Sequence, residues 1–199
     1  MATIEYFYAG YSAFAYLGHA ELRRIANTAG RKINHRPFDL RRLMTTTGAP
    51  VFSERSKAHK DYFFGQEIER WAAFRNIPVM QGTPTYHAHD ITLSNCMLIA
   101  GLVQGVNIDG LAQEMLHAHW VDDFDLNNPE ALRKIGRNAG IDPDPLLAAA
   151  SSDEVQTIYT ENTEEAIKRC IFGSPTYFVD GDMYYGQDHL ELIAHALNV

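Results

Sequence analysis

Strand-forming segments occur only near the two ends of this chain, and this constrains its fold more than any other feature. At the first end, short β-branched and aromatic runs cover 3–8 and 32–38. A helical pattern at 13–29 lies between them, where Ser12 can cap the first turn and Gly30 can end the last one. These residues predict a βαβ unit.

The other end of the chain carries the complementary pattern. A helix is predicted at 153–171, followed by a strand at 176–179 and a turn at Asp180-Gly181. A further strand at 183–185 and a last helix from Asp188 complete the chain. This end therefore reads as helix, two strands and helix.

Residues from about 43 to 152 follow helical periodicity and carry little strand signal. The candidate helices cover 58–75, 93–104, 109–121, 129–139 and 143–149. Because the strands at the two ends must pair in one sheet, we expect an α/β domain formed by 1–42 and 153–199, interrupted by an inserted all-helical domain at 43–152.

Composition and charge exclude several classes of protein. The 199 residues are 46% apolar, which is enough to bury a core, and no stretch approaches the roughly 18 to 20 apolar residues of a membrane span. Glu5 interrupts an N-terminus that lacks a basic signal region, so we expect a cytoplasmic protein without a membrane partner. The net charge of −8 and the dispersed basic residues argue against nucleic acid.

Cysteine and histidine spacing gives no metal or dithiol site. Cys96 and Cys170 form neither a Cys-x-x-Cys pair nor a metal-ligand spacing. His87 and His89 share a face only if they lie on a strand, and the second pair, at 117 and 119, diverges on a helix. We therefore expect solvated or core histidines and no bound metal.

The turn before the first helix is a candidate site for an anion. The amides of a helix N-terminus lack partners and carry about half a positive charge. Ser12 is the hydroxyl of the turn Tyr11-Ser12-Ala13-Phe14, and it can donate a hydrogen bond to a thiolate, the reactive form of a thiol. The alternative is that Ser12 only caps the helix.

Two further motifs lie near the C-terminal strands. Pro175 opens a strand directly after a helix, a position suited to a cis peptide bond that would leave the backbone of Ser174 free to pair with an extended peptide. The alternative is a plain strand start with the default trans bond. Gln187 lies in the turn before Asp188, which either caps the last helix or binds a ligand's ammonium group.

Together these motifs resemble the 2-hydroxychromene-2-carboxylate isomerases and kappa-class glutathione transferases, relatives of the DsbA oxidoreductases with serine in place of the first active-site cysteine. The stretches that carry the resemblance are Ser12-Ala13-Phe14-Ala15-Tyr16-Leu17, Phe172-Gly173-Ser174-Pro175-Thr176-Tyr177-Phe178-Val179-Asp180-Gly181 and Gly186-Gln187-Asp188-His189-Leu190. A weaker match covers Lys60, Glu67, Arg70, Trp71 and Ile77-Pro78. The resemblance implies a thioredoxin-like domain with an inserted helical domain.

The resemblance also implies a glutathione site. Ser12 would stabilise the glutathione thiolate, and the cysteinyl backbone would pair with Ser174 beside a cis Pro175. Gln187 and Asp188 would meet the γ-glutamyl end. Lys60 would hold the glycyl carboxylate, with Lys57 close enough in sequence to compete. Members of the family are often homodimers, so we expect a homodimer here.

The resemblance leaves three functions open. The first is a glutathione-dependent isomerase of an aromatic catabolite like 2-hydroxychromene-2-carboxylate, the second a kappa-like transferase or peroxidase, and the third a non-catalytic module. The chain also departs from the family, which usually has Asp-Phe-x-Ser-Pro at the first motif where this chain has Ala9-Gly10-Tyr11-Ser12-Ala13. Ser174 stands where valine is usual. These departures predict a wider pocket beside the sulfur and a different electrophilic substrate.

Overall fold

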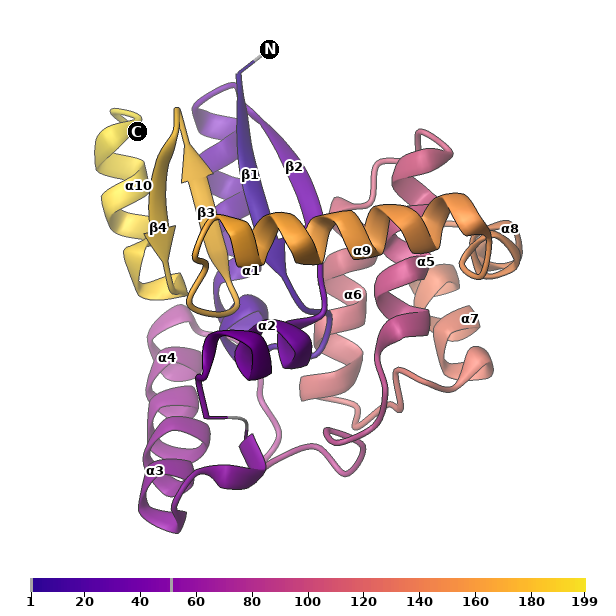
Figure 1. Cartoon of the computed structure of the whole chain (residues 1–199). Coiled ribbons are helices and arrows are strands. Elements are labelled where there is room, and N and C mark those ends of the chain that lie inside the picture. The colour runs from indigo at the N-terminus through magenta and orange to yellow at the C-terminus, as the bar shows by residue number, and fades with distance from the viewer. Residues whose placement is uncertain (1, 51) are drawn as a thin grey trace.

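The computed structural model describes residues 2–50 and 52–199 (Figure 1). In chain order the elements are β1 (Thr3–Tyr8), α1 (Ala13–Thr28), β2 (Lys32–Pro37), α2 (Leu40–Thr47), the 3₁₀ turn η1 (Phe52–Glu54), α3 (Lys57–Asp61), the π-helical turn η2 (Tyr62–Gln66), α4 (Glu67–Arg75), α5 (Thr92–Val103), α6 (Asp109–Trp120), α7 (Pro129–Asn138), α8 (Pro143–Ala149), α9 (Asp153–Lys168), β3 (Thr176–Val179), β4 (Asp182–Tyr185), the 3₁₀ turn η3 (Gln187–His189) and α10 (Leu190–Ala196).

The two ends of the chain meet in a four-stranded sheet of the described residues, with the strand order β2-β1-β3-β4. β1 runs parallel to β2 and antiparallel to β3, and β4 pairs antiparallel with β3. The central strand β1 places Tyr6 opposite both His35 and Tyr177. The predicted pairing of the two chain ends in one sheet is therefore confirmed.

Helices cover both faces of the sheet, and the alternation of side chains along β1 sorts them. Tyr6 and Tyr8 point to the same side as α1 and belong to the larger core, whereas Phe7 points to the other side. There Phe7 packs with Phe178 of β3, Leu43 of α2 and other buried side chains. Figure 1 shows α9 crossing in front of the sheet while α1 lies behind it.

Helices α5 to α8 stand beside this sheet and join it through a continuous apolar core. α6 packs against α1, and α5 packs against β2, α8 and α9. The predicted fold class, an α/β thioredoxin-like sheet with an inserted helical region, is confirmed. The domain boundaries at 42/43 and 152/153 stay a prediction.

The structure corrects several predicted elements in this framework. Helix α2 was not predicted, and it begins before the expected start of the insertion. The helix expected at 58–75 is interrupted by the π-helical turn η2. Helix α9 ends at Lys168 rather than 171, because Cys170 takes a positive φ of 55° that a helix cannot continue through. The last helix starts with the 3₁₀ turn η3 before α10.

The surface and the helix lengths add two findings. None of the helices in residues 2–50 and 52–199 has both the length and the hydropathy needed to cross a membrane.

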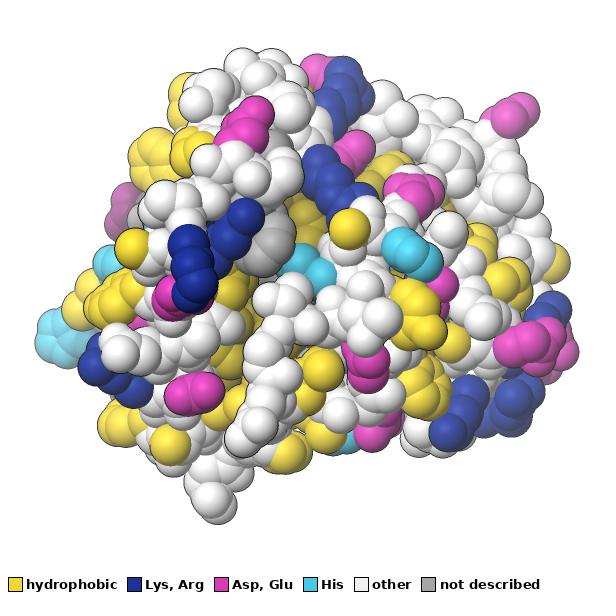
Figure 2. All heavy atoms as spheres, turned by 90° about the horizontal axis from the view of Figure 1, so that it is seen from below, with side chains coloured by type: hydrophobic (Ala, Val, Ile, Leu, Met, Phe, Trp, Pro, Cys, Tyr) yellow, Lys and Arg dark blue, Asp and Glu magenta, His cyan; other side chains and the backbone are white. Residues whose placement is uncertain are grey.

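On the face seen from below in Figure 1, acidic and basic side chains are interspersed, and hydrophobic side chains occupy the hollow between them (Figure 2). Positive and negative charges are therefore mixed on that face.

Candidate functional site

Ser12 sits at the junction where β1 ends and α1 begins. Its backbone is extended, with φ −70° and ψ 122°, and its Oγ accepts a hydrogen bond from the Ala15 amide at 3.3 Å. The side chain therefore caps α1, as one of the two interpretations of the sequence required. The first turn of α1 contains no acidic residue, so the positive end of this 16-residue helix is uncompensated.

The Ser12 hydroxyl makes a second contact that a cap does not need. Ser12 Oγ donates to the carbonyl oxygen of Ser174 at 3.1 Å, across 162 positions of sequence. In return, the Ser174 Oγ accepts from the Ala9 amide at 3.0 Å. The Ser174–Pro175 peptide bond is cis, as the resemblance implied. The structure thus brings Ser12, Ser174 and Pro175 together at one point.

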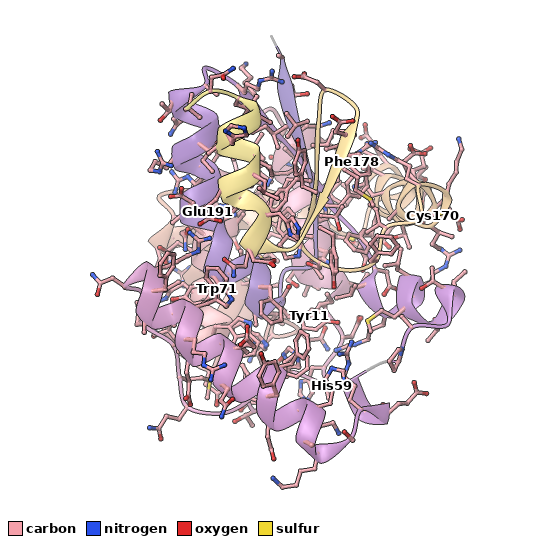
Figure 3. All side chains as sticks on the ribbon, turned by 90° about the vertical axis from the view of Figure 1, so that its left-hand side faces the viewer. Tyr11, His59, Trp71, Cys170, Phe178 and Glu191 are labelled. Atoms are coloured by element: carbon pink, nitrogen blue, oxygen red, sulfur yellow. The ribbon has the colours of Figure 1, made fainter. Side chains whose placement is uncertain are left out.

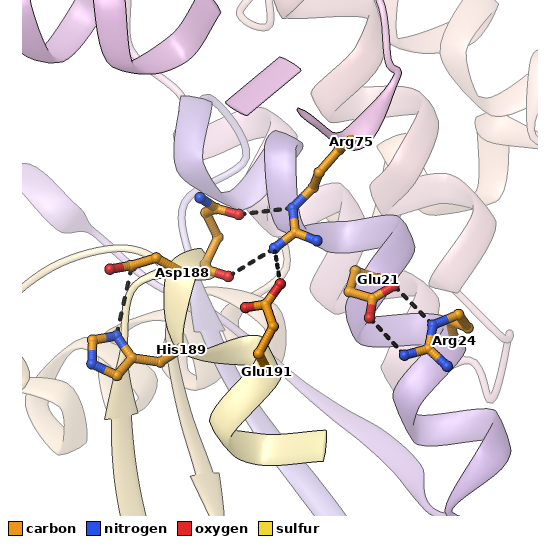
Figure 4. Close-up of polar contacts among 7 residues, drawn as sticks. Glu21, Arg24, Arg75, Asp188, His189 and Glu191 are labelled. Carbon is orange, nitrogen blue, oxygen red and sulfur yellow. Dashed lines mark hydrogen bonds and ion pairs between the residues drawn. The ribbon is translucent and has the colours of Figure 1, made fainter. Parts of the chain in front are cut away.

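Gln187 is buried in η3, which packs against α1. The Pro175 carbonyl accepts from the Gly186 amide at 2.9 Å, which ties the turn before η3 to Pro175. Gln187 is 1% exposed, and its Oε1 accepts from Arg75 Nε at 2.9 Å while its carbonyl accepts from Arg75 Nη2 at 3.1 Å (Figure 4). Arg75 also pairs with Glu191 at 3.4 Å.

Asp188 is exposed and keeps its carboxylate toward solvent. Its side chain is 55% exposed, and Oδ1 lies 3.6 Å from Nδ1 of His189 (Figure 4). Among the described residues, the caps of η3 and α10 make no side-chain hydrogen bond, so Asp188 does not cap the last helix. A β-carbon at Gly186 would stand 2.3 Å from Asp188 Oδ1, so the glycine leaves room for this carboxylate.

Lys60 lies on a different part of the chain, the arm formed by α3, η2 and α4. Its Nζ donates to the Ser53 carbonyl at 3.4 Å, whereas Lys57 pairs with Asp61 at 2.5 Å and is 87% exposed. The arm rests on the start of α1, where the rings of Phe14 and Phe63 are 6.1 Å apart. Lys60 is therefore carried by the arm that packs beside the Ser12 turn.

Neither cysteine supplies a thiol to this site. Cys96 is buried in α5, and burial raises the pKa of its thiol to about 11, so it is not a ready nucleophile. Cys170 is exposed after α9. The hydrogen bonds of the two thiols are to Gln156 and to the Lys168 carbonyl, not to the Ser12 turn.

Trp120, Arg41 and His87 surround Tyr11, the residue before Ser12, and these contacts were not predicted. The Tyr11 carbonyl accepts from Trp120 Nε1 at 2.8 Å, and the Arg41 guanidinium lies 5.1 Å above the Tyr11 ring. The His87 ring meets the Tyr11 ring edge-on at 4.9 Å. Figure 3 shows Tyr11 in the middle of the molecule, next to the arm that carries His59 and Trp71.

His87 and the buried His119 contact each other, a pairing that the sequence did not predict. His87 lies in a turn rather than on a strand, and its Nδ1 is 3.0 Å from Nε2 of His119. His119 Nδ1 must donate to the Phe124 carbonyl at 3.1 Å, so a neutral His119 accepts at Nε2 from His87. Burial, with His119 and Arg41 close by, lowers the pKa of His87 to about 3 and keeps it neutral.

A family model described as the DSBA-like thioredoxin domain matches residues 3–198. This chain belongs to the DSBA-like thioredoxin domain family. The match spans the sheet, the inserted helices and every site residue described above. The family assignment therefore confirms the fold predicted for the two chain ends.

Curated relatives within this family carry two kinds of name. The chain is 27% identical to a 2-hydroxychromene-2-carboxylate isomerase of Sphingobium xenophagum, covering 96% of this chain and 95% of the relative. It is also 27% identical to an isomerase of the same name from Pseudomonas sp. (strain C18), covering 99% and 91%. Glutathione S-transferase kappa 1 of Rattus norvegicus is 24% identical, covering 98% and 90%. The resemblance stated from the motifs is confirmed.

Solved structures of the DSBA-like family share the fold. A 2-hydroxychromene-2-carboxylate isomerase superposes with a TM-score of 0.80 at 22% identity, covering 98% of this chain and 94% of the other. The cytosolic disulfide reductase DsbM from Pseudomonas aeruginosa, solved with GSH, gives a TM-score of 0.67 at 11% identity, covering 99% and 100%. At these identities the likeness concerns the fold alone.

Proposed function

We propose that this chain binds glutathione with its sulfur at Ser12 and uses the thiolate to isomerise an aromatic catabolite like 2-hydroxychromene-2-carboxylate. The observation that carries the proposal is the position of the Ser12 hydroxyl. It lies at the start of α1, whose first turn has no acidic residue, and it donates a hydrogen bond to the Ser174 carbonyl from a turn without cysteine. The names of the curated relatives support the same reaction class.

The residues at this site suit a thiolate energetically. Lowering a thiol pKa by two units requires ~2.7 kcal/mol of preferential stabilisation of the thiolate. A charge-assisted hydrogen bond from the Ser12 hydroxyl is worth about 1.5 to 3 kcal/mol, and the positive end of α1 adds about 0.3 to 1 kcal/mol. Together they supply what the proposal needs.

The site holds both groups with which a cysteinyl residue would form hydrogen bonds. The Ser12 hydroxyl donates to the Ser174 carbonyl, so each of these groups is the other's hydrogen-bond partner. A bound thiolate would accept the hydrogen bond from the Ser12 hydroxyl, and the cysteinyl amide would donate one to the Ser174 carbonyl. The exchange leaves no polar group of this pair without a partner.

The remaining contacts are assigned to the two ends of the tripeptide. We assign the γ-glutamyl ammonium to the exposed Asp188 carboxylate, next to Gln187. We assign the glycyl carboxylate to Lys60 on the α3–η2–α4 arm. Gln187 Oε1 already accepts a hydrogen bond from Arg75. We therefore propose that Gln187 holds the turn that carries Asp188 and that its Nε2 donates to the γ-glutamyl end.

Bound glutathione supplies a thiolate that adds reversibly to a conjugated double bond, which then rotates as a single bond before the thiolate leaves. In this scheme Ser12 holds the sulfur by its hydroxyl proton before addition and after elimination. Tyr11 and Trp120 are buried next to Ser12, and in this scheme they limit the access of water to the sulfur. No proton has to be exchanged with either cysteine.

The direct test is an assay of isomer ratio on a ring-opened hydroxyaryl enone carboxylate, with the free thiol measured in parallel. We expect turnover only with glutathione present and full recovery of the thiol. Loss of thiol in proportion to product would instead support a kappa-like transferase, which the kappa relatives make the second candidate. Binding of glutathione without turnover on any electrophile would support a non-catalytic module.

Asp188→Asn is expected to weaken glutathione binding by about 10- to 100-fold, because a hydrogen bond to a charged partner is worth about 1.5 to 3 kcal/mol. Calorimetric titration measures the change. Asp182→Asn is the matched control, since Asp182 is an exposed carboxylate at the start of β4. Equal affinity of the two variants would remove Asp188 from the site.

Lys60→Met is expected to weaken glutathione binding several-fold, by about 1 kcal/mol for a partly exposed ion pair. Lys57→Met should leave binding unchanged, because Lys57 points to solvent and pairs with Asp61. The same titration compares both variants. If Lys57→Met were the weaker binder, the glycyl carboxylate would have to be assigned to Lys57.

We also propose that the protein acts in the cytoplasm as a homodimer. Sedimentation equilibrium of the purified chain measures the mass in solution and tests the dimer.

A further inference from the structure

The loop that presents Ser12 is held by side chains from distant parts of the chain. The Ala9 amide donates to Ser174 Oγ at 3.0 Å, and the Ala9 carbonyl accepts from the Ser12 amide at 2.9 Å. The Gly10 amide donates to Asn95 Oδ1 at 3.0 Å, and the Tyr11 carbonyl accepts from Trp120 Nε1 at 2.8 Å. The Ser12 amide is a local backbone partner, and two of the three side-chain partners, Asn95 and Trp120, lie on the inserted helices α5 and α6.

Asn95 uses both ends of its amide in this arrangement. The side chain is 0% exposed, Oδ1 accepts from Gly10, and Nδ2 donates to the Phe38 carbonyl at 3.2 Å. The orientation of the amide is fixed by its partners, because a backbone N–H only donates and a carbonyl only accepts. Asn95 therefore ties the loop before α1 to the residue that follows β2.

Gly10 packs closely against Asn95, and a larger residue at this position would crowd the Asn95 side chain. A β-carbon at this position would lie 3.1 Å from Asn95 Oδ1 and 3.4 Å from Met115 Sδ. Gly10 is not among the residues with positive φ, so the glycine serves close approach rather than backbone conformation. Gly10, two residues before Ser12, therefore lies in close contact with Asn95.

We infer that Asn95 is a positioning residue for the Ser12 turn, through which the inserted helices set the reactivity of a thiol bound there. The part of this inference that concerns the thiol rests on the proposed function. Without Asn95, a buried Gly10 N–H loses its partner and the turn relaxes to find another. Small displacements of a positioned group reduce catalysis strongly.

The chain offers a matched control for the structural part of this role. Asn162 on α9 is 2% exposed, and its Nδ2 donates to the Pro37 carbonyl at 3.0 Å, one residue before the carbonyl that Asn95 holds. Both asparagines thus hold the end of β2 from a buried position on a helix. Only Asn95 also accepts from the loop that carries Ser12.

The experiment compares Asn95→Ala with Asn162→Ala. Amide hydrogen exchange at Gly10 is measured without glutathione, and the pKa of bound glutathione and kcat are measured with it. We expect both variants to lose stability. Only Asn95→Ala should speed Gly10 exchange by more than about tenfold, raise the bound thiol pKa by about one unit and lower kcat by about 10- to 100-fold.

Gly10→Ala supplies a second, independent readout. The added β-carbon pushes on Asn95 Oδ1, so Gly10→Ala should be less harmful in an Asn95→Ala background than in the wild type. This coupling and the Gly10 exchange can be measured whether or not glutathione binds, so failure of the proposed function would show separately. Additive stability losses together with Gly10 exchange and thiol pKa at wild-type values in Asn95→Ala would overturn the inference.

Discussion

Ser12→Ala is expected to lower kcat by about two to three orders of magnitude, the usual cost of removing one hydrogen-bond donor from a developing or reacting anion. Glutathione affinity should fall by less than about tenfold, because the tripeptide keeps its contacts at both ends. The reason is that the Ser12 hydroxyl at the start of α1 is a hydrogen-bond donor, and it donates to the Ser174 carbonyl at 3.1 Å. Steady-state kinetics and calorimetric titration measure the two effects.

The control for Ser12→Ala must account for its capping role. Ser152 caps α9, which like α1 has 16 residues, and its Oγ accepts from the Val155 amide at 3.4 Å. Ser152→Ala and Ser12→Ala should each reduce the free energy of unfolding by about 1 kcal/mol. Only Ser12→Ala should reduce kcat. Equal kcat in the two variants would mean that Ser12 is a helix cap and nothing more.

Arg75→Met is expected to have the largest effect on stability among the substitutions considered. Arg75 gives Gln187 two hydrogen bonds, at 2.9 and 3.1 Å, and lies 5.3 Å from the Trp71 ring centroid. Leaving the buried Gln187 oxygen without a donor costs about 1 to 3 kcal/mol, and the lost cation–π contact adds about 0.5 to 1 kcal/mol. Chemical denaturation should show a loss of about 2 to 4 kcal/mol.

Arg75→Met should also weaken glutathione binding, since Gln187 supports the turn that carries Asp188. Arg24→Met is the control, because Arg24 pairs with Glu21 on the surface of α1, at 2.7 Å, and is 55% exposed. That variant should stay within about 0.5 kcal/mol of the wild type. A small stability loss for Arg75→Met, similar to that for Arg24→Met, would contradict the account of Gln187 as a buried, arginine-held residue.

The predictable parts of the fold were those with strong local signals. Ser12 and Gly30 bracket α1, and the aromatic runs mark β1 and β3 within the bounds that the structure gives. Helix α2 escaped prediction although Asp39 caps it and Gly48 ends it in the left-handed region. Its eight residues end in three threonines and bury only Leu43, so the apolar period was too short to detect.

The predictable parts of the site were likewise local. Ser12, Ser174 and Asp188 each stand at a helix or strand start that a motif can mark. Asn95, Trp120 and Arg75 were missed because each acts through a contact to a residue 85, 109 or 112 positions away. Buried polar residues with helical spacing look the same in sequence whether they support a site or only a core.

The histidines illustrate the same limit. From their spacing we expected solvated or core histidines, and the contact between His87 and His119, across 32 positions, was not predicted. The pairing depends on a turn that periodicity does not describe. It also decides that His87 faces Tyr11 beside the site, which the spacing alone could not indicate.

The most direct test of the central claim is a pH titration of glutathione bound to the purified protein, following thiolate absorbance in the ultraviolet. We expect glutathione to bind with a thiol pKa well below that of free glutathione. This pKa shift should be lost in Ser12→Ala but kept in Ser152→Ala. Absence of binding, or a bound thiol with the pKa of free glutathione, would contradict the assignment of Ser12 as a thiolate site.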